Sequence, residues 1–232
     1  MNAITLSDLN VFLSGSHVLQ GVSLEVPSNK VTALLGRNGV GKTTTLRAIM
    51  GLIPSTGTIN FFDKSINGIP TYKIAQSGIG YVPEDRDIFS SLTVAENLSL
   101  AVRDAHPNYD LVYSLFPELS QRGPQRAGTL SGGQQQMVAI ARALLNKNRI
   151  ILIDEPTKGL APKLVGEVAE ALSKVANETT MLLVEQNLAL VKSVAEHIIV
   201  MSQGTVIFQG EPQNLENDEF VHSMLGVSGG LH

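Results

Sequence analysis

Apolar and polar residues alternate along residues 4–13 and 18–26, and a short polar stretch separates the two runs. Alternation with a period of two is typical of strands that bury one face, so we expect an antiparallel, hairpin-like pair here. The runs 57–62 and 78–82 predict two further strands. The run 31–35 predicts a strand that leads directly into a glycine-rich loop.

Helical spacing of apolar residues dominates between about residues 85 and 145, which predicts an inserted helical subdomain. Its candidate helices are 93–101, 109–119 and 131–145. On either side of this block, strands and helices alternate, which is typical of a mostly parallel sheet with covered faces. The remaining predicted elements are helices at 43–50, 162–176 and 187–195 and strands at 149–153, 180–184, 197–202 and 204–209.

These patterns predict an α/β fold with a mostly parallel sheet, an N-terminal antiparallel β subdomain and an inserted helical subdomain. A chain of 232 residues is long enough for one such domain with a sizeable core, so we expect residues 1–232 to form a single domain.

The net charge of −4 and the lack of a Lys/Arg block do not favour a nucleic-acid surface. The chain has no cysteine, which excludes disulfides and thiolate metal sites. The N-terminal residues show no signal-peptide pattern, and no apolar run approaches the ~18 residues that span a bilayer. Any role at a membrane is therefore expected to come through a partner.

Residues 36–43 read G-R-N-G-V-G-K-T and match the phosphate-binding pattern G-x-x-x-x-G-K-[ST]. A glycine loop between a strand and a helix points backbone N–H groups inward, and the helix dipole adds positive potential. We expect Lys42 to reach the terminal phosphates and the Thr43 hydroxyl to ligate Mg²⁺. This motif makes the fold a P-loop NTPase core. The expected nucleotide-binding residues here are Gly36, Arg37, Asn38, Gly39, Val40, Gly41, Lys42, Thr43 and Thr44.

Two carboxylates, Asp154 and Glu155, follow a run of branched apolar residues. The carboxyl end of a strand is where parallel α/β sheets place ligand chemistry. We expect Asp154 to hold the Mg²⁺ shell and Glu155 to act as the general base on the attacking water. The alternative is that the two acids only end the strand at the protein surface. The phosphate-binding loop in the same chain argues against this alternative.

Ser131, Gly132 and Gly133 open a predicted helix, which on their own indicates an ordinary serine N-cap. Preceded by Leu130 and followed by Gln134, about twenty residues before the acidic strand, they resemble the signature of the ATP-binding subunits of ABC transporters. In that family two subunits pair head to tail, and the signature of one completes the ATP site of the other. The resemblance implies that this chain works as half of a dimer.

The resemblance covers nearly the whole chain. Within the family, the chain is most similar to one branch, the ATPases of importers for branched-chain amino acids and for urea and short amides. The segments that carry it are 80–86, 125–130, 158–162 and 183–187. Residues 16–19 and 36–40 favour the urea and amide members, whereas 125–128 favour the amino-acid members, so both solute classes stay open.

The family implies ATP and Mg²⁺ as cofactors and two transmembrane permease subunits as partners. It also implies a second ATPase, as a paralogue or a second copy, and an indirect link to an extracytoplasmic solute-binding protein. Such subunits are peripheral on the cytoplasmic face of the membrane. The stretch 84–97 is expected to relay motion to the permease.

Four positions depart from the family pattern. Glu84 stands where a Gln usually contacts Mg²⁺ and water, Gln186 stands where a His usually senses the γ-phosphate, and Ala161 replaces an Asp. The aromatic residue that usually stacks on adenine falls at about Leu13, with Phe12 beside it.

Gln186 can hydrogen-bond phosphate but cannot become cationic at neutral pH. We hypothesise that a second ATPase supplies the more complete site and that this chain contributes its signature to it. The alternative is that Gln186 is a neutral variant with full activity. A subunit that binds ATP with little turnover is the main rival function, and the retained Glu155 argues against it.

Other classes fit less well. A P-loop GTPase needs an N-K-x-D motif, but residues 146–149 read N-K-N-R. Non-transport ABC ATPases that act on DNA or ribosomes carry coiled coils or two cassettes, and this chain has neither.

Overall fold

The computed structural model describes residues 1–176 and 178–215. The predicted end of the domain at residue 232 lies outside the described residues. In the described part, none of the helices combines the length and the apolar character needed to cross a membrane.

The first sheet is antiparallel, with the strand order β2-β1-β4-β5. The long strands β1 and β2 pair from Asn2 with Pro27 to Leu13 with Ser16, so the predicted N-terminal pair is confirmed. The two-residue strand β5 was not predicted, because two residues are too few for a periodic pattern. The bounds are β1 (Asn2–Leu13), β2 (Ser16–Pro27), β4 (Thr56–Phe61) and β5 (Lys64–Ser65).

The second sheet has the order β10-β9-β3-β8-β7-β6, and its strands are parallel except for β10 at one edge. Every residue of β3, β7 and β8 is buried, as expected for strands covered on both faces. The predicted mostly parallel sheet is confirmed. The bounds are β3 (Val31–Leu35), β6 (Ile79–Val82), β7 (Ile150–Asp154), β8 (Thr180–Val184), β9 (His197–Ser202) and β10 (Thr205–Gly210).

The side chains of β7 divide between two hydrophobic cores. Ile151 and Ile153 pack with the helical lobe and α7 (Pro162–Ala176), whereas Ile150 and Leu152 pack with the antiparallel sheet and α1 (Lys42–Ile49). Alternate residues of a strand point to opposite faces, so this division follows directly from the sequence.

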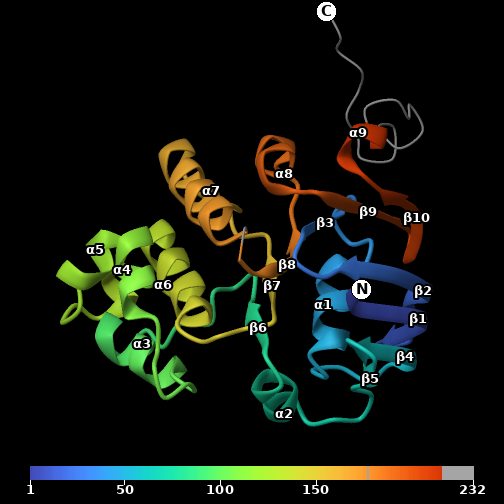
Figure 1. Cartoon of the computed structure of the whole chain (residues 1–232), viewed down its shortest axis with the longest axis horizontal. Helices are drawn as coiled ribbons and strands as arrows, with labels where there is room; N and C mark the ends of the chain where they lie inside the picture. The colour runs from blue at the N-terminus through green and yellow to red at the C-terminus, as the bar shows by residue number, and fades with distance from the viewer. Residues whose placement is uncertain (177, 216–232) are drawn as a thin grey trace, which may run out of the picture.

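Helices α3 to α6 gather into a lobe beside the parallel sheet (Figure 1). The predicted single helix 109–119 is wrong: α4 ends at Leu115, and α5 begins at Pro117. Proline has no N–H and disfavours helical geometry in the preceding residue, and Phe116 accordingly has φ −130° and ψ 72°. The lobe contains α3 (Val94–Ala101), α4 (Tyr109–Leu115), α5 (Pro117–Gln121), a 3₁₀ turn (Ala127–Thr129) and α6 (Gly132–Leu144).

Three short helices complete the described fold. They are α2 (Thr71–Gln76), α8 (Leu188–Val194) and α9 (Pro212–Leu215). Only α8 matches a predicted helix, since α2 spans too few residues to show a helical period.

Candidate nucleotide site

The glycine loop between β3 and α1 is built tightly against its neighbours. Gly36 has φ +148°, and a Cβ there would lie 2.5 Å from the carbonyl oxygen of Met201. Gly41 has φ +107°, and a Cβ there would lie 2.5 Å from Leu19. Both positions therefore need glycine.

The Lys42 side chain is buried and folds over this loop. Its Nζ donates hydrogen bonds to the carbonyl oxygens of Gly36, at 2.8 Å, and Arg37, at 3.0 Å. Burial lowers the pKa of Lys42, while the charges of Glu155 and Asp154 oppose that shift. The ammonium group thus lies where a phosphate bound by the loop would meet it.

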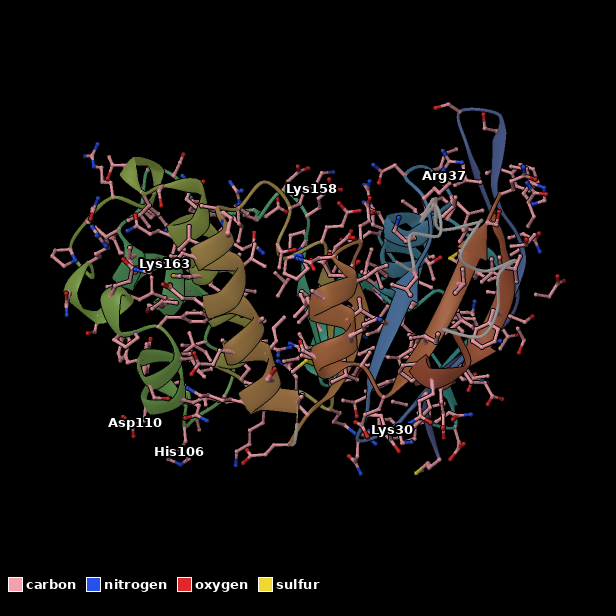
Figure 2. The ribbon with its side chains drawn as sticks, turned by 90° about the horizontal axis from the view of Figure 1, so that it is seen from above. Lys30, Arg37, His106, Asp110, Lys158 and Lys163 are labelled. Atoms are coloured by element: carbon pink, nitrogen blue, oxygen red, sulfur yellow. The ribbon has the colours of Figure 1, made fainter. Side chains whose placement is uncertain are left out.

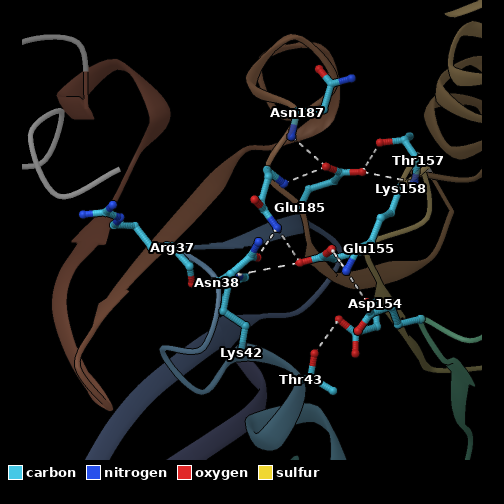
Figure 3. Close-up of polar contacts among 12 residues, drawn as sticks. Arg37, Asn38, Lys42, Thr43, Asp154, Glu155, Thr157, Lys158, Glu185 and Asn187 are labelled. Carbon is cyan, nitrogen blue, oxygen red and sulfur yellow. Dashed lines mark hydrogen bonds and ion pairs between the residues drawn. The ribbon is translucent and has the colours of Figure 1, made fainter. Parts of the chain in front are cut away.

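Asp154, the last residue of β7, has a fully buried side chain that faces the start of α1 (Figure 3). Its Oδ1 accepts a hydrogen bond from Thr43 Oγ1 at 3.2 Å, and its Oδ2 is buried without a partner. Burial raises the pKa of Asp154 to about 6, against the lowering effect of the Thr43 hydrogen bond. A carboxylate oxygen beside a hydroxyl is a donor set that fits Mg²⁺.

Glu155 turns sharply out of the strand, with φ +44°, in the left-handed region that side chains rarely adopt. Its Oε1 lies 4.0 Å from Lys42 Nζ and accepts a hydrogen bond of 2.7 Å from Gln186 Nε2. Its Oε2 lies 3.3 Å from Lys158 Nζ. The carboxylate is almost wholly buried, yet each oxygen has a polar partner.

Gln186 follows β8 and joins the loop to Glu155. Its Nε2 also donates to Asn38 Oδ1 at 2.6 Å. The structure therefore brings the predicted residues Asn38, Lys42, Thr43, Asp154, Glu155 and Gln186 together at the carboxyl ends of β3, β7 and β8 (Figure 3).

Two residues of this cluster had no predicted role. The buried Glu185 accepts hydrogen bonds from the backbone N–H groups of Thr157, Gln186 and Asn187 and from the Thr157 hydroxyl. Lys158 contacts Glu84, the residue expected to meet Mg²⁺. Glu185 directly follows the buried strand β8, as Asp154 ends β7, so the same strand-end argument could have found it.

The signature residues lie apart from this cluster, at the start of α6 in the helical lobe (Figure 1). Ser131 caps the helix by accepting from the Gln134 N–H at 3.3 Å, and Gln134 Oε1 accepts from the Ser131 N–H at 3.0 Å. Gly132 faces Arg86, and a Cβ on Gly133 would strike Leu164. Leu130, just before the cap, is buried.

Phe12 and Leu13 end β1 at the tip of the hairpin. Phe12 is 61% exposed, and its ring stacks on His17 with centroids 4.1 Å apart. Leu13 is partly buried against the core of the antiparallel sheet. The structure thus places one largely exposed aromatic side chain at this tip.

The family model described as "ABC transporter" matches residues 19–158, which span the glycine loop, the signature and the acidic strand. The branched-chain amino acid transport ATP-binding protein BraG of Pseudomonas aeruginosa is 36% identical over 211 residues, 88% of this chain and 91% of that protein. The probable branched-chain amino acid transport ATP-binding protein LivF of Archaeoglobus fulgidus is 33% identical, with 94% and 97% covered. The lipopolysaccharide export system ATP-binding protein LptB of Escherichia coli is 34% identical, with 95% of both chains covered.

The comparison with solved structures leads to the same family as the comparison of sequences. A nucleotide-free ATP-binding cassette from an ABC transporter superposes with a TM-score of 0.84 at 25% identity, covering 100% of both chains. The family match, the relatives and the fold together confirm the resemblance drawn from the signature. The chain therefore belongs to the ABC transporter family, and it is one of that family's ATPases.

Proposed function

We propose that this chain hydrolyses ATP to power the import of a small solute through a membrane permease. The solute class we infer is branched-chain or other neutral amino acids, or urea and short amides. The observation that carries the proposed hydrolysis is the position of Glu155, which contacts both Lys42 and Gln186 beside the glycine loop. The likeness to BraG and LivF, named as branched-chain amino acid transport proteins, supports the transport role. We further infer that residues 1–232 act as one ATP-binding domain, with 85–145 as its helical subdomain.

The roles we assign to the side chains follow from their contacts. The loop amides and Lys42 bind the phosphates, and Glu155 accepts the proton of the water that attacks the γ-phosphorus as the bond to ADP breaks. Gln186 orients Glu155 and the terminal phosphate. Thr43 and Asp154 would hold Mg²⁺, which when bound neutralises charge on the phosphates, and Glu84 is the proposed third contact. Phe12 and Leu13 are the proposed adenine platform.

The signature, residues 130–134, is proposed to act in trans on the ATP site of a second ATPase. The signature begins α6 in the helical lobe, whereas the glycine loop of the same chain precedes α1 in the other lobe (Figure 1). This separation supports an action of the signature on another subunit. The partner is a paralogous ATPase or a second copy of this chain.

A groove next to β6 is the proposed permease contact. Met50, Tyr81, Pro83, Arg103 and Arg142 line it, between α2 and the helical lobe. Arg86, in the stretch 84–97, donates from Nε to Gln136 Oε1 of α6 at 3.3 Å. Motion of a permease segment in the groove would thereby reach the signature helix. The subunit would be peripheral on the cytoplasmic face, with a solute-binding protein acting through the permease.

Affinity capture of tagged Glu155→Gln protein from its native cells, with ATP and Mg²⁺, tests the proposal. We expect two permease subunits and a second ATPase, and the reconstituted wild-type complex should take up labelled leucine or urea when ATP is supplied. Capture of export components, as the likeness to LptB would allow, or of ribosomes or DNA would overturn the import role.

The second candidate is a subunit that binds ATP with little turnover and mainly completes the site of its partner. The uncharged contact of Gln186 with Glu155 favours it, because an amide cannot supply a positive charge to the γ-phosphate. Wild-type turnover that survives inactivation of the partner's site would exclude it.

A further inference from the structure

Glu84 and Lys158 come from different strand ends, yet their side chains meet. Lys158 Nζ contacts Glu84 Oε1, just after β6, and lies 3.3 Å from Glu155 Oε2, just after β7. One ammonium group therefore bridges two carboxylates from neighbouring strands. Figure 2 shows Lys158 at the same edge of the molecule as Arg37, and Lys30 at the opposite edge.

Several carboxylates lie close together at this edge. Glu84, Asp154 and Glu155 converge here, and the charges of Glu84 and Glu155 both help to raise the pKa of Asp154. A nucleotide adds several more negative charges, and like charges at short range repel. Among the described residues, Lys42 forms an ion pair with Glu155, and Lys158 is the ion-pair partner of Glu84.

The backbone of Lys158 is fixed, although its side chain is 52% exposed. Its N–H donates to the Glu155 carbonyl oxygen at 3.1 Å, and the preceding Thr157 is bound through its N–H and hydroxyl to the buried Glu185. A single exposed ion pair is worth little. This pair differs because the ammonium starts from an anchored turn and also reaches the buried Glu155.

We propose that Lys158 is a positioning residue that neutralises Glu84, so that the two side chains serve the ATP site as one uncharged unit. The proposal rests on the proposed function of the site. Loss of Lys158 alone leaves the Glu84 carboxylate unpaired beside the nucleotide. Loss of both charges removes the repulsion together with the group that relieved it. The effects of the two substitutions are therefore coupled.

The test is a double-mutant cycle on the full chain with Glu84→Gln, Lys158→Ser and the double variant. The first readout is the Kd of ATP in EDTA at low salt, which does not depend on turnover. We expect Lys158→Ser to weaken ATP binding about fivefold beside Glu84 and less than about twofold beside Gln at that position. The weakening should shrink at high salt.

Two further variants serve as controls. Lys158→Arg keeps the charge and should bind ATP like the wild type. Lys163→Ser removes a lysine whose partner, Glu167, lies on α7 at 3.8 Å, and it should leave the Kd unchanged. Equal effects of Lys158→Ser in both backgrounds, or an equal effect of Lys163→Ser, would overturn the proposal.

ATP hydrolysis by the wild-type complex separates this inference from the proposed function. Hydrolysis together with independent effects of the two substitutions overturns the Glu84–Lys158 unit alone. A complex that binds ATP but never hydrolyses it overturns the proposed function alone, because the coupling between Glu84 and Lys158 is measured from ATP affinity.

Discussion

Gln186 Nε2 donates a hydrogen bond of 2.7 Å to Glu155 Oε1, so a side chain from the loop after β8 holds the carboxylate that follows β7. The same amide nitrogen lies 2.6 Å from Asn38 Oδ1 in the glycine loop. A neutral side chain therefore connects the proposed base to the loop that would hold phosphate. This contact fixes the position of Glu155 without changing the charge around it, which leads to the first two predictions.

Glu155→Gln should lower ATP turnover about 100-fold or more while leaving ATP binding intact. The amide keeps the size of the side chain but cannot accept a proton from water. Single-turnover hydrolysis and equilibrium ATP binding measure the two effects separately. A variant that hydrolyses ATP at more than about a tenth of the wild-type rate would remove Glu155 as the general base.

Gln186→His should raise the turnover of the assembled complex, because an imidazole can carry positive charge towards the γ-phosphate and Glu155. Gln186→Ala is the matched control, and it should lower turnover by removing the contact altogether. Steady-state rates at saturating ATP decide between the two hypotheses for this site. A histidine variant no faster than the wild type would show that Gln186 is a neutral replacement.

The sequence predicts those parts of the site that depend on contiguous residues. Strands β7 and β8 are short apolar runs buried on both faces, and the acids at the end of β7 and the glycine loop each form one unbroken motif. The α7 helix matches its predicted bounds because its apolar residues keep a regular spacing over four turns.

Contacts between distant segments are what the sequence does not supply. The pairing of Glu84 with Lys158 requires β6 and β7 to be neighbours in the sheet. The order of strands in a sheet cannot be predicted from local patterns of apolar and polar residues. The break of the predicted helix 109–119 is different, because Pro117 was visible in the sequence and its effect on Phe116 is local.

Glu185→Gln should reduce turnover about tenfold with little change in ATP affinity. Both oxygens of Glu185 accept hydrogen bonds, and an amide would turn an NH₂ group towards N–H donors of Thr157 or Gln186. The displaced Gln186 would lose its hold on Glu155. A split between kcat and Kd tests this role, and a parallel loss of both would indicate a general packing defect, which thermal unfolding would reveal.

The buried Asp154 makes the stability of the folded protein depend on pH, and the direction of that dependence follows from its pKa. Its pKa is raised from 3.8 to about 6 in the folded, metal-free protein. Between about pH 4 and 6 the folded state keeps a proton that the unfolded chain has lost, so stability falls as the pH rises through this window. The cost is fully present above about pH 6.

Asp154→Asn should remove that cost, because the amide carries no charge to desolvate and can still accept the Thr43 hydrogen bond. In EDTA at pH 8 we expect the variant to be more stable to urea by on the order of 2 kcal/mol. At pH 4 the two proteins should unfold alike. The same variant should bind ATP more weakly in the presence of Mg²⁺, since a neutral oxygen replaces the proposed carboxylate ligand. Equal urea midpoints at pH 8 would show that the buried Oδ2 carries no desolvation cost, and unchanged Mg²⁺ dependence would remove Asp154 from the proposed metal site.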